Sequence, residues 1–163
     1  MKIAIISDIH DNLVNLKKCL DWCGSSGTEE IVCCGDVTNS DTLNYLSKNF
    51  ANTIHLVKGN MELYDQSEIE YLKNIKYYGK TGRFNIDNLT IGACHEPYLF
   101  DRLLEMGKYD FIFYGHTHRP WEEEKDGVKM VNPGTLSAMF QQATFALLDS
   151  ESKKIQLLLL ENI

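Results

Sequence analysis

The chain has 163 residues, the size of one ordinary domain, and is long enough to bury a hydrophobic core. Its 44% hydrophobic and 24% charged residues are typical of a soluble globular protein. A formal net charge of -7 at pH 7 argues against broad nucleic-acid binding and against binding to anionic membranes, because both need a basic surface.

The sequence also predicts a reducing, cytoplasmic setting. The N-terminal segment MKIAIISDIH reaches a carboxylate at position 8, so no signal peptide is expected. The apolar run LLLL at residues 157–160 is far too short to cross a bilayer, so no membrane partner is expected. The cysteines are odd in number, form no CxxC pair and are interpreted as reduced, buried apolar residues. They are Cys19, Cys23, Cys33, Cys34 and Cys94.

Strand and helix signals alternate in the first half of the chain. The strands are short and apolar nearly throughout, and the first helix carries apolar side chains at offsets of three and four. Asp11 or Asn12 is its natural N-cap. This order predicts a parallel sheet covered on both faces. The expected strands are residues 2–6, 30–36 and 53–60, and the expected helices are residues 12–23 and about 40–48.

The second half is richer in strands. Residues 83–86 and 89–95 flank Asp-Asn, a plausible hairpin turn, and a helix is expected over about 98–107. The remaining strands are expected over residues 110–116, 128–134, 144–150 and 154–161. No internal repeat, low-complexity tract or linker interrupts the chain, which predicts a single domain over residues 1–163.

Metal-compatible side chains follow five of the predicted strands at their carboxyl ends, the edge at which open α/β sheets bind ligands. They are Asp8, His10, Asp36, Asn60, His95, His116 and His118. At strand spacing, the imidazoles of His116 and His118 would point the same way. The fifth histidine, His55, lies inside a strand without a partner nearby in sequence, and we interpret it as structural rather than as a ligand.

Each of these candidate ligands, taken alone, has a simpler explanation than metal binding. Asp8 and His10 suit a helix cap and a surface histidine, and Gly-Asp and Gly-Asn are ordinary turn dipeptides. These explanations do not account for all seven residues falling at strand ends, so we predict one shared metal site. Seven ligands are too many for one tetrahedral zinc and suit two ions, with Asp36 as the expected bridging carboxylate. Asn60 would ligate through its amide oxygen.

The chain resembles the calcineurin-like metallophosphoesterases through the blocks SDIHDN, CGDVTN, KGNME, ACHEP, YGHTHRP and VNPGTLS, in this order. The resemblance covers nearly the whole chain. In its short length, the chain resembles the small bacterial and archaeal phosphodiesterase branch of this family, which also contains the retromer subunit. The resemblance implies a four-layer α/β/β/α sandwich, two mixed β-sheets flanked by helices. It also implies a hydrolase that cleaves phosphodiesters through a hydroxide bridging two metal ions.

The resemblance further divides the ligands between the two ions. Asp8, His10, Asp36 and His118 would hold the first ion, and Asp36, Asn60, His95 and His116 the second. Mn²⁺ is the expected ion, although Ni²⁺, Fe²⁺ or Zn²⁺ also suits these ligands. Asn12 would either donate a hydrogen bond to the substrate phosphate or cap the following helix.

The chain departs from the family pattern in two blocks. Met61 stands where a histidine often helps to protonate the leaving group, and Glu62 replaces an aspartate. A thioether cannot donate a proton, so the general acid is unassigned and hydrolysis is expected to favour leaving groups of low pKa. In the fourth block, Glu96 and Pro97 replace a glycine-rich turn, and Glu96 is expected to face solvent.

Two other functions are compatible with parts of the sequence. A non-catalytic protein-interaction scaffold on the same fold should have eroded ligands, but all seven ligand positions are intact. An amidohydrolase-type enzyme also uses His-x-His, but this chain is too short for an eight-stranded barrel. The substrate, expected to be a small phosphorylated molecule, is not specified. Tyr64, Tyr98 and Trp121 would either stack on a base or pack normally, and an exposed edge strand near residues 157–160 leaves a homo-oligomer open.

Overall fold

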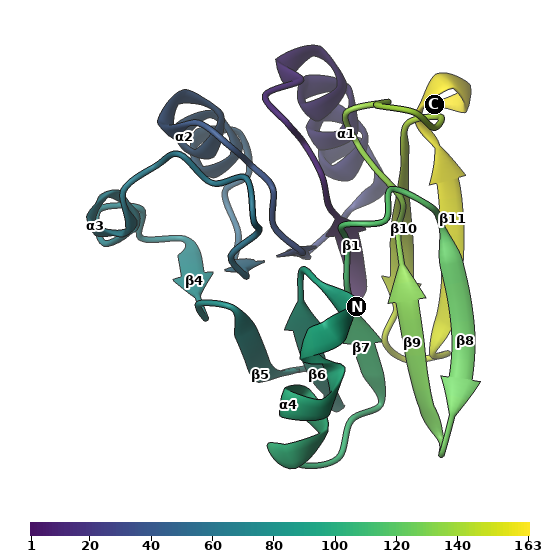
Figure 1. Cartoon of the computed structure of the whole chain (residues 1–163). Coiled ribbons are helices and arrows are strands. Elements are labelled where there is room, and N and C mark those ends of the chain that lie inside the picture. The colour runs from purple at the N-terminus through teal and green to yellow at the C-terminus, as the bar shows by residue number, and fades with distance from the viewer.

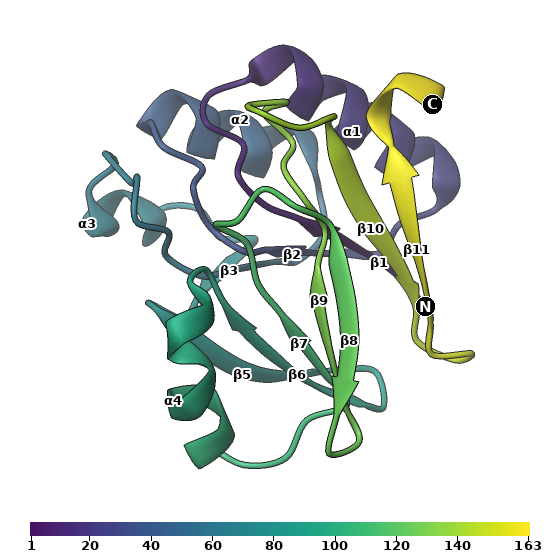
Figure 2. The same cartoon turned by 45° about the vertical axis from the view of Figure 1, so that its right-hand side comes forward.

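The computed structural model describes residues 1–163 and contains two mixed β-sheets that pack face to face, with helices outside them (Figure 1, Figure 2). The strands of the first sheet are β1 (Lys2–Ile6), β2 (Glu30–Cys33), β3 (Ile54–Leu56), β4 (Ile75–Tyr77), β10 (Thr144–Asp149) and β11 (Lys154–Leu159). They lie in the order β11-β10-β1-β2-β3-β4. The neighbours from β1 to β4 are parallel, whereas β10 pairs antiparallel with both β1 and β11.

The second sheet is built from the middle of the chain. Its strands are β5 (Thr81–Ile86), β6 (Leu89–Cys94), β7 (Phe111–Phe113), β8 (Trp121–Lys125) and β9 (Val128–Asn132). They lie in the order β5-β6-β7-β9-β8, with parallel pairing of β7 to both β6 and β9 and antiparallel pairing at the two edges. The predicted hairpin between β5 and β6 is confirmed, and Asp87 takes the left-handed conformation in its turn (φ 53°).

Helices cover the outer faces of both sheets. Figure 2 places α1 (Leu13–Ser26) and α2 (Ser40–Asn49) over the first sheet and α4 (Phe100–Glu105) on the other side, against the second sheet. The short helix α3 (Gln66–Ile69) lies near β4 (Figure 1). One 3₁₀ turn, Pro97–Leu99, precedes α4. A second, Leu160–Asn162, follows β11 near the C-terminus. The predicted class, two mixed sheets flanked by helices, is therefore confirmed.

Strand β1 explains why both faces of the first sheet are covered. Ile3 and Ile5 pack in the core between the two sheets, while Ala4 and Ile6 pack beneath the helices. Because successive side chains of a strand point to opposite faces, a continuous apolar run must be buried on both sides. The second sheet buries its outer face in a smaller core that includes Leu103 of α4.

Several predicted boundaries and elements differ from the structure. Strand β7 ends at Phe113, so the strand predicted over residues 110–116 is shorter than expected, and His116 and His118 lie in the loop that follows it. Strand β8 was missed because all five of its residues are exposed and its WEEEK sequence has no apolar alternation. The short elements β4 and α3 were also missed. That residues 1–163 form a single domain stays a prediction.

Candidate metal centre

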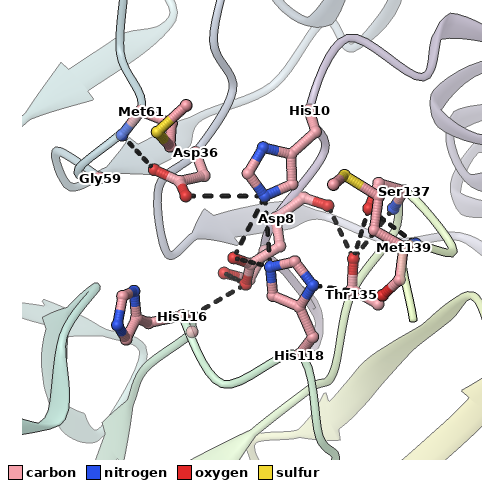
Figure 3. A network of polar contacts seen from close by, with 12 residues as sticks. Asp8, His10, Asp36, Gly59, Met61, His116, His118, Thr135, Ser137 and Met139 are labelled. Carbon is pink, nitrogen blue, oxygen red and sulfur yellow. Dashed lines mark hydrogen bonds and ion pairs between the residues drawn. The ribbon is translucent and has the colours of Figure 1, made fainter. Parts of the chain in front are cut away.

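All seven predicted ligands lie on the loops that follow five strands. Figure 3 shows five of them close together: Asp8, His10, Asp36, His116 and His118. In the first sheet, β1 leads to Asp8 and His10, β2 to Asp36 and β3 to Asn60; in the second, β6 leads to His95 and β7 to His116 and His118. The face-to-face packing of the sheets brings the two groups of loops together. The predicted convergence in space is therefore present in the structure.

Asp8 is the centre of the contacts nearest α1. Its Oδ1 atom lies 3.1 Å from His118 Nε2 and 3.7 Å from His10 Nε2, and the two imidazole Nε2 atoms are 3.3 Å apart. Asp36 Oδ2 approaches His10 Nε2 at 3.6 Å. Asp8, His10 and His118 thus present three ligand atoms to one small volume.

The second group of contacts centres on His95. Its Nε2 atom lies 3.2 Å from Asp36 Oδ2 and 3.9 Å from Asp8 Oδ1, and these three residues form another compact ligand set. His116 Nδ1 lies 2.9 Å from Asn60 Oδ1. Asp36 Oδ2 therefore lies between His10 and His95, as a bridging carboxylate requires, but Asp8 also reaches both sides.

Two of the candidate ligand atoms suit a divalent ion because they have no hydrogen-bond partner in the protein. No N–H or O–H group satisfies Asp8 Oδ1 or His95 Nε2, although both atoms are buried. His95 Nδ1 donates to the Cys34 carbonyl at 2.7 Å, so in the neutral ring the Nε2 lone pair faces the carboxylates. Buried lone pairs that face one another are unfavourable unless a cation lies between them. The arrangement suits a site for metal ions.

The backbone at the site is also unusual. The residues Asp8, His10, Asp36, His116 and His118 have φ values of 54°, 44°, 54°, 69° and 57°, in the left-handed region. Such conformations cost on the order of 1–3 kcal/mol each in non-glycine residues and persist only where surrounding contacts enforce them. Backbone hydrogen bonds, such as Asp8 N to Gly35 O and His10 N to Asp36 O, hold these turns.

Charge distributes unevenly among the ligands. Burial alone would raise the pKa of Asp8, but its contacts with His10 and His118 hold that pKa well below its ordinary value. Burial likewise opposes the shift at Asp36, whose pKa is lowered mainly by His95. The Asp8 carboxylate raises the pKa of His118, and Asp36 and Asp8 raise the pKa of His95 against the opposing effect of burial. In the metal-free protein, His95 and His118 therefore hold a proton to higher pH than a free histidine does.

We expect the metal-free protein to be less stable at pH 8.5 than at pH 6. The raised pKa of His95 and His118 stabilises the fold fully below their unfolded value of about 6.5, and this stabilisation is lost as the pH rises through the folded pKa. The lowered pKa of Asp8 has no effect here, because its contribution is lost only below about pH 4. A Tm decrease of roughly 2–4 °C, corresponding to about 1 kcal/mol, should appear by calorimetry.

Added Mn²⁺ should raise the Tm more at pH 8.5 than at pH 6. At the higher pH, fewer protons compete with the ions for the histidine ligands. The His118→Gln variant should have a smaller difference in metal-free Tm between the two pH values. A Tm that is the same at both values in the metal-free wild-type protein would contradict the expected linkage.

Three other side chains hold the ligand loops and were not assigned this role from the sequence. Ser7 Oγ donates to Asp8 Oδ2 at 2.6 Å, and Thr135 Oγ1 donates to the Asp8 carbonyl at 3.0 Å. Glu62 accepts hydrogen bonds from the backbone N–H groups of Val37, Thr38 and Gly59. The only signal in the sequence was their position inside the blocks SDIHDN, KGNME and VNPGTLS, which does not specify a partner.

The remaining candidate residues have simpler placements. Asn12 caps α1 by accepting from Asn15 N at 3.0 Å, and its amide donates to the Ser137 carbonyl, so the capping interpretation is confirmed. Its contact with substrate stays a prediction. His55 is buried between Glu30 and Tyr78 and is structural, as expected. Glu96 is half-buried and accepts from Tyr98 Oη at 3.1 Å rather than facing solvent fully.

The three aromatic residues that are candidates for stacking on a base differ in their surroundings. Tyr64 packs in the core beneath the helices, which is ordinary packing. Tyr98 and Trp121 are 67% and 59% exposed and remain available to a ligand. All five cysteines are buried and free, as predicted. No helix of the structure is long and apolar enough to span a membrane.

The fold and the ligand set together define a class of protein, the metallophosphoesterases. The profile of the calcineurin-like phosphoesterase superfamily domain matches residues 1–153, and the chain belongs to this family. Phosphodiesterase MJ0936 of Methanocaldococcus jannaschii is 31% identical over 167 aligned residues, which cover 99% of this chain and 100% of that protein. Phosphodiesterase YfcE of Escherichia coli is 25% identical, covering 93% and 89% of the two chains. The predicted enzyme class, a phosphoesterase, is confirmed.

Solved structures agree with this assignment. The structure of a novel archaeal phosphodiesterase superposes with a TM-score of 0.87 at 27% identity and covers 98% of this chain and 99% of that one. Vps29 from Chaetomium thermophilum has a TM-score of 0.72 at 18% identity over 97% and 95% of the chains, which demonstrates a shared fold. The predicted family is thereby confirmed, and Vps29 shares its fold.

Proposed function

We propose that this chain is a binuclear-metal-dependent phosphodiesterase. The observation that carries the proposal is the convergence of two buried carboxylates, four imidazoles and one amide where loops of the two sheets meet. Asp8 Oδ1 and His95 Nε2 form no hydrogen bond there. The similarity to phosphodiesterases along the whole chain supports a diester as the substrate. The ligand chemistry favours Mn²⁺, with Ni²⁺, Fe²⁺ or Zn²⁺ as alternatives.

The residues of the chain would bind and orient the reacting groups. Asp8, His10, Asp36 and His118 would hold one ion, and Asp36, Asn60, His95 and His116 the other. When bound, two such ions generate a hydroxide nucleophile from water near neutral pH and offset the charge that develops on the phosphoryl oxygens. The hydrogen bonds of Ser7 to Asp8 and of Met61 N to Asp36 Oδ1 fix the two carboxylates in place.

The test is hydrolysis of bis-p-nitrophenyl phosphate by metal-free protein and by protein loaded with Mn²⁺, Ni²⁺, Fe²⁺ or Zn²⁺. We expect activity only with metal, and no hydrolysis with any of the four ions would refute the proposal. A cytoplasmic location also stays a prediction, supported by five free buried thiols, which are typical of a reducing compartment.

The second prediction concerns the leaving group. Met61 is 50% exposed beside Asp36, and its thioether cannot protonate a departing alkoxide. We therefore expect aryl phosphodiesters to be hydrolysed much faster than alkyl monoesters, whose leaving groups need an acid. Met61→His should raise the rate on alkyl esters by about tenfold or more and leave aryl esters nearly unchanged, measured as kcat/KM over a leaving-group series.

The matched control is Met106→His, a similarly exposed methionine (45%) at the end of α4. This variant should leave the whole series unchanged. If Met61→His has the same effect on aryl and alkyl esters, another group supplies the proton and the assignment of position 61 is wrong.

A further inference from the structure

A cavity of about 340 Å³ adjoins the candidate metal centre on the side of His118. It is lined by His116, Thr117, His118, Arg119, Phe140 and Gln141, which we call the Phe140 pocket. No carboxylate lines it, although the chain carries a net charge of -7. Its volume lies within the range of small-ligand sites, roughly 300–1,000 Å³. A substrate bound at the metal centre would therefore extend into a non-acidic pocket.

The aromatic ring of this pocket is exposed, and the loop that carries it is held by backbone contacts. Phe140 is 87% exposed, and its ring centroid lies 6.3 Å from that of His118. Its φ of 63° and the same φ at Ala138 are unfavourable for residues with a side chain. The loop is fixed at Met139, whose carbonyl lies 3.3 Å from His118 Nδ1 and whose N–H donates to Ser137 Oγ at 3.1 Å. The ring thus presents a face beside the metal centre on which a planar group can stack.

Arg119 adds a cation to the same pocket. Its only hydrogen bond is from its backbone N–H to Thr117 Oγ1 at 3.4 Å, and its guanidinium has no carboxylate partner. Arg119 also borders a second cavity, of about 450 Å³, together with Trp121, which is 59% exposed. An unpaired arginine between exposed aromatic rings is the combination that binds nucleotides, because bases stack on the rings and oxygens accept from the guanidinium.

Figure 3 places the apolar side chains on two sides of the ligands, with Met61 and Met139 on opposite sides of His10. Met61 is 50% and Met139 is 43% exposed. The Phe140 pocket, which combines an aromatic ring with a cation, lies on the Met139 side, because Met139 directly precedes Phe140 and its carbonyl lies 3.3 Å from His118 Nδ1. The two sides therefore differ in chemistry, and one ester group of a diester would be recognised on the Phe140 side.

We propose that the Phe140 pocket is a nucleoside subsite. One ester group of the substrate carries a nucleobase that stacks on Phe140, while Arg119 donates hydrogen bonds to an oxygen of the same group. This inference rests on the proposed phosphodiesterase function and narrows its substrates to small nucleotide-type diesters. The acidic surface disfavours long nucleic acids, whose binding requires many basic contacts.

The test measures binding rather than turnover, by calorimetric titration of the Mn²⁺-loaded protein with adenosine 5′-monophosphate and with methyl phosphate. Wild-type protein should bind adenosine 5′-monophosphate at least about tenfold more tightly than methyl phosphate, because stacking of one base contributes a binding free energy of this size. Phe140→Ala should remove this preference without changing the affinity for methyl phosphate, and Phe140→Tyr should retain it. Arg119→Gln should weaken nucleotide binding by about three- to tenfold.

Tyr71→Ala is the matched control, because Tyr71 is an equally exposed aromatic residue (83%) next to α3 and outside the pocket. It should keep the full preference. Equal affinity of the wild-type protein for the two ligands, or a preference that survives Phe140→Ala, overturns the subsite while hydrolysis of bis-p-nitrophenyl phosphate remains intact. Absence of hydrolysis together with preferred nucleotide binding would instead reject the proposed function and retain the subsite.

Discussion

Replacing Asp36 by asparagine is expected to lower phosphodiesterase activity by at least about 10³-fold and to reduce the bound Mn²⁺ from two ions per chain to one or none. Asp36 Oδ2 lies 3.2 Å from His95 Nε2 and 3.6 Å from His10 Nε2, so one atom lies between ligands of both proposed ions. The amide has the same shape as the carboxylate but no charge, so it removes the bridging ligand without removing volume.

The fold should tolerate this change. Asp36 Oδ1 accepts from Met61 N at 2.8 Å, and an asparagine carbonyl can accept the same bond. The metal content of purified protein, measured by elemental analysis, and kcat/KM on bis-p-nitrophenyl phosphate are therefore informative together. Asp21→Asn is the control, because Asp21 is exposed and forms only a surface ion pair with Lys17, a contact of small energetic value.

The same measurement distinguishes the two carboxylates. If Asp36→Asn retains two ions and near wild-type activity, Asp36 does not bridge. Asp8→Asn should then lose both ions, since Asp8 Oδ1 lies within 3.9 Å of His10, His95 and His118. If both variants still bind two ions, the proposal that these residues form a binuclear centre is wrong.

Gly59→Ala is expected to destabilise the protein by about 2–4 kcal/mol and to abolish metal binding. A Cβ atom at position 59 would lie 2.0 Å from Asp36 Oδ1 and 2.3 Å from Asp36 N. The second of these is a backbone atom, so the clash cannot be relieved by a change of rotamer. Either the loop after β2 or the loop after β3 must move, and both carry proposed ligands.

Urea denaturation of the metal-free protein measures the loss, as a lower midpoint with an unchanged slope. Gly24→Ala is a matched control within the exposed part of α1, where an added Cβ meets nothing within 4 Å. That variant should stabilise the protein by about 0.5–1 kcal/mol, because alanine is a better helix residue than glycine. A Gly59→Ala protein with wild-type stability and metal content would contradict the close packing of the two loops.

The sequence alone predicted the alternation of β1, α1, β2, α2 and β3 because each element carries its signal within a few consecutive residues. The same locality applies to the ligands. Asp8, Asp36 and Asn60 directly follow apolar runs, and parallel strands bring their carboxyl ends to one edge. Order and residue type were therefore enough to predict the family, which is confirmed, and to propose the set of ligands.

Short or exposed elements could not be predicted from the sequence in this way. Strand β8 has no buried residue, and β4 has three residues. Strand β8 exists because β9 offers backbone hydrogen bonds, whereas β4 buries Ile75 but is too short to show a strand pattern. The antiparallel insertion of β10 beside β1 likewise depends on contacts between residues more than 140 positions apart.

The sequence by itself thus determined which residues of this protein are available as ligands and which helices and strands carry them. Only the tertiary structure decided their distances, the left-handed turns at Asp8 and His118, and the position of Phe140 beside the centre. The physical reason is that ligand identity is a property of single residues, whereas geometry results from packing between two sheets that meet only after the whole chain has folded.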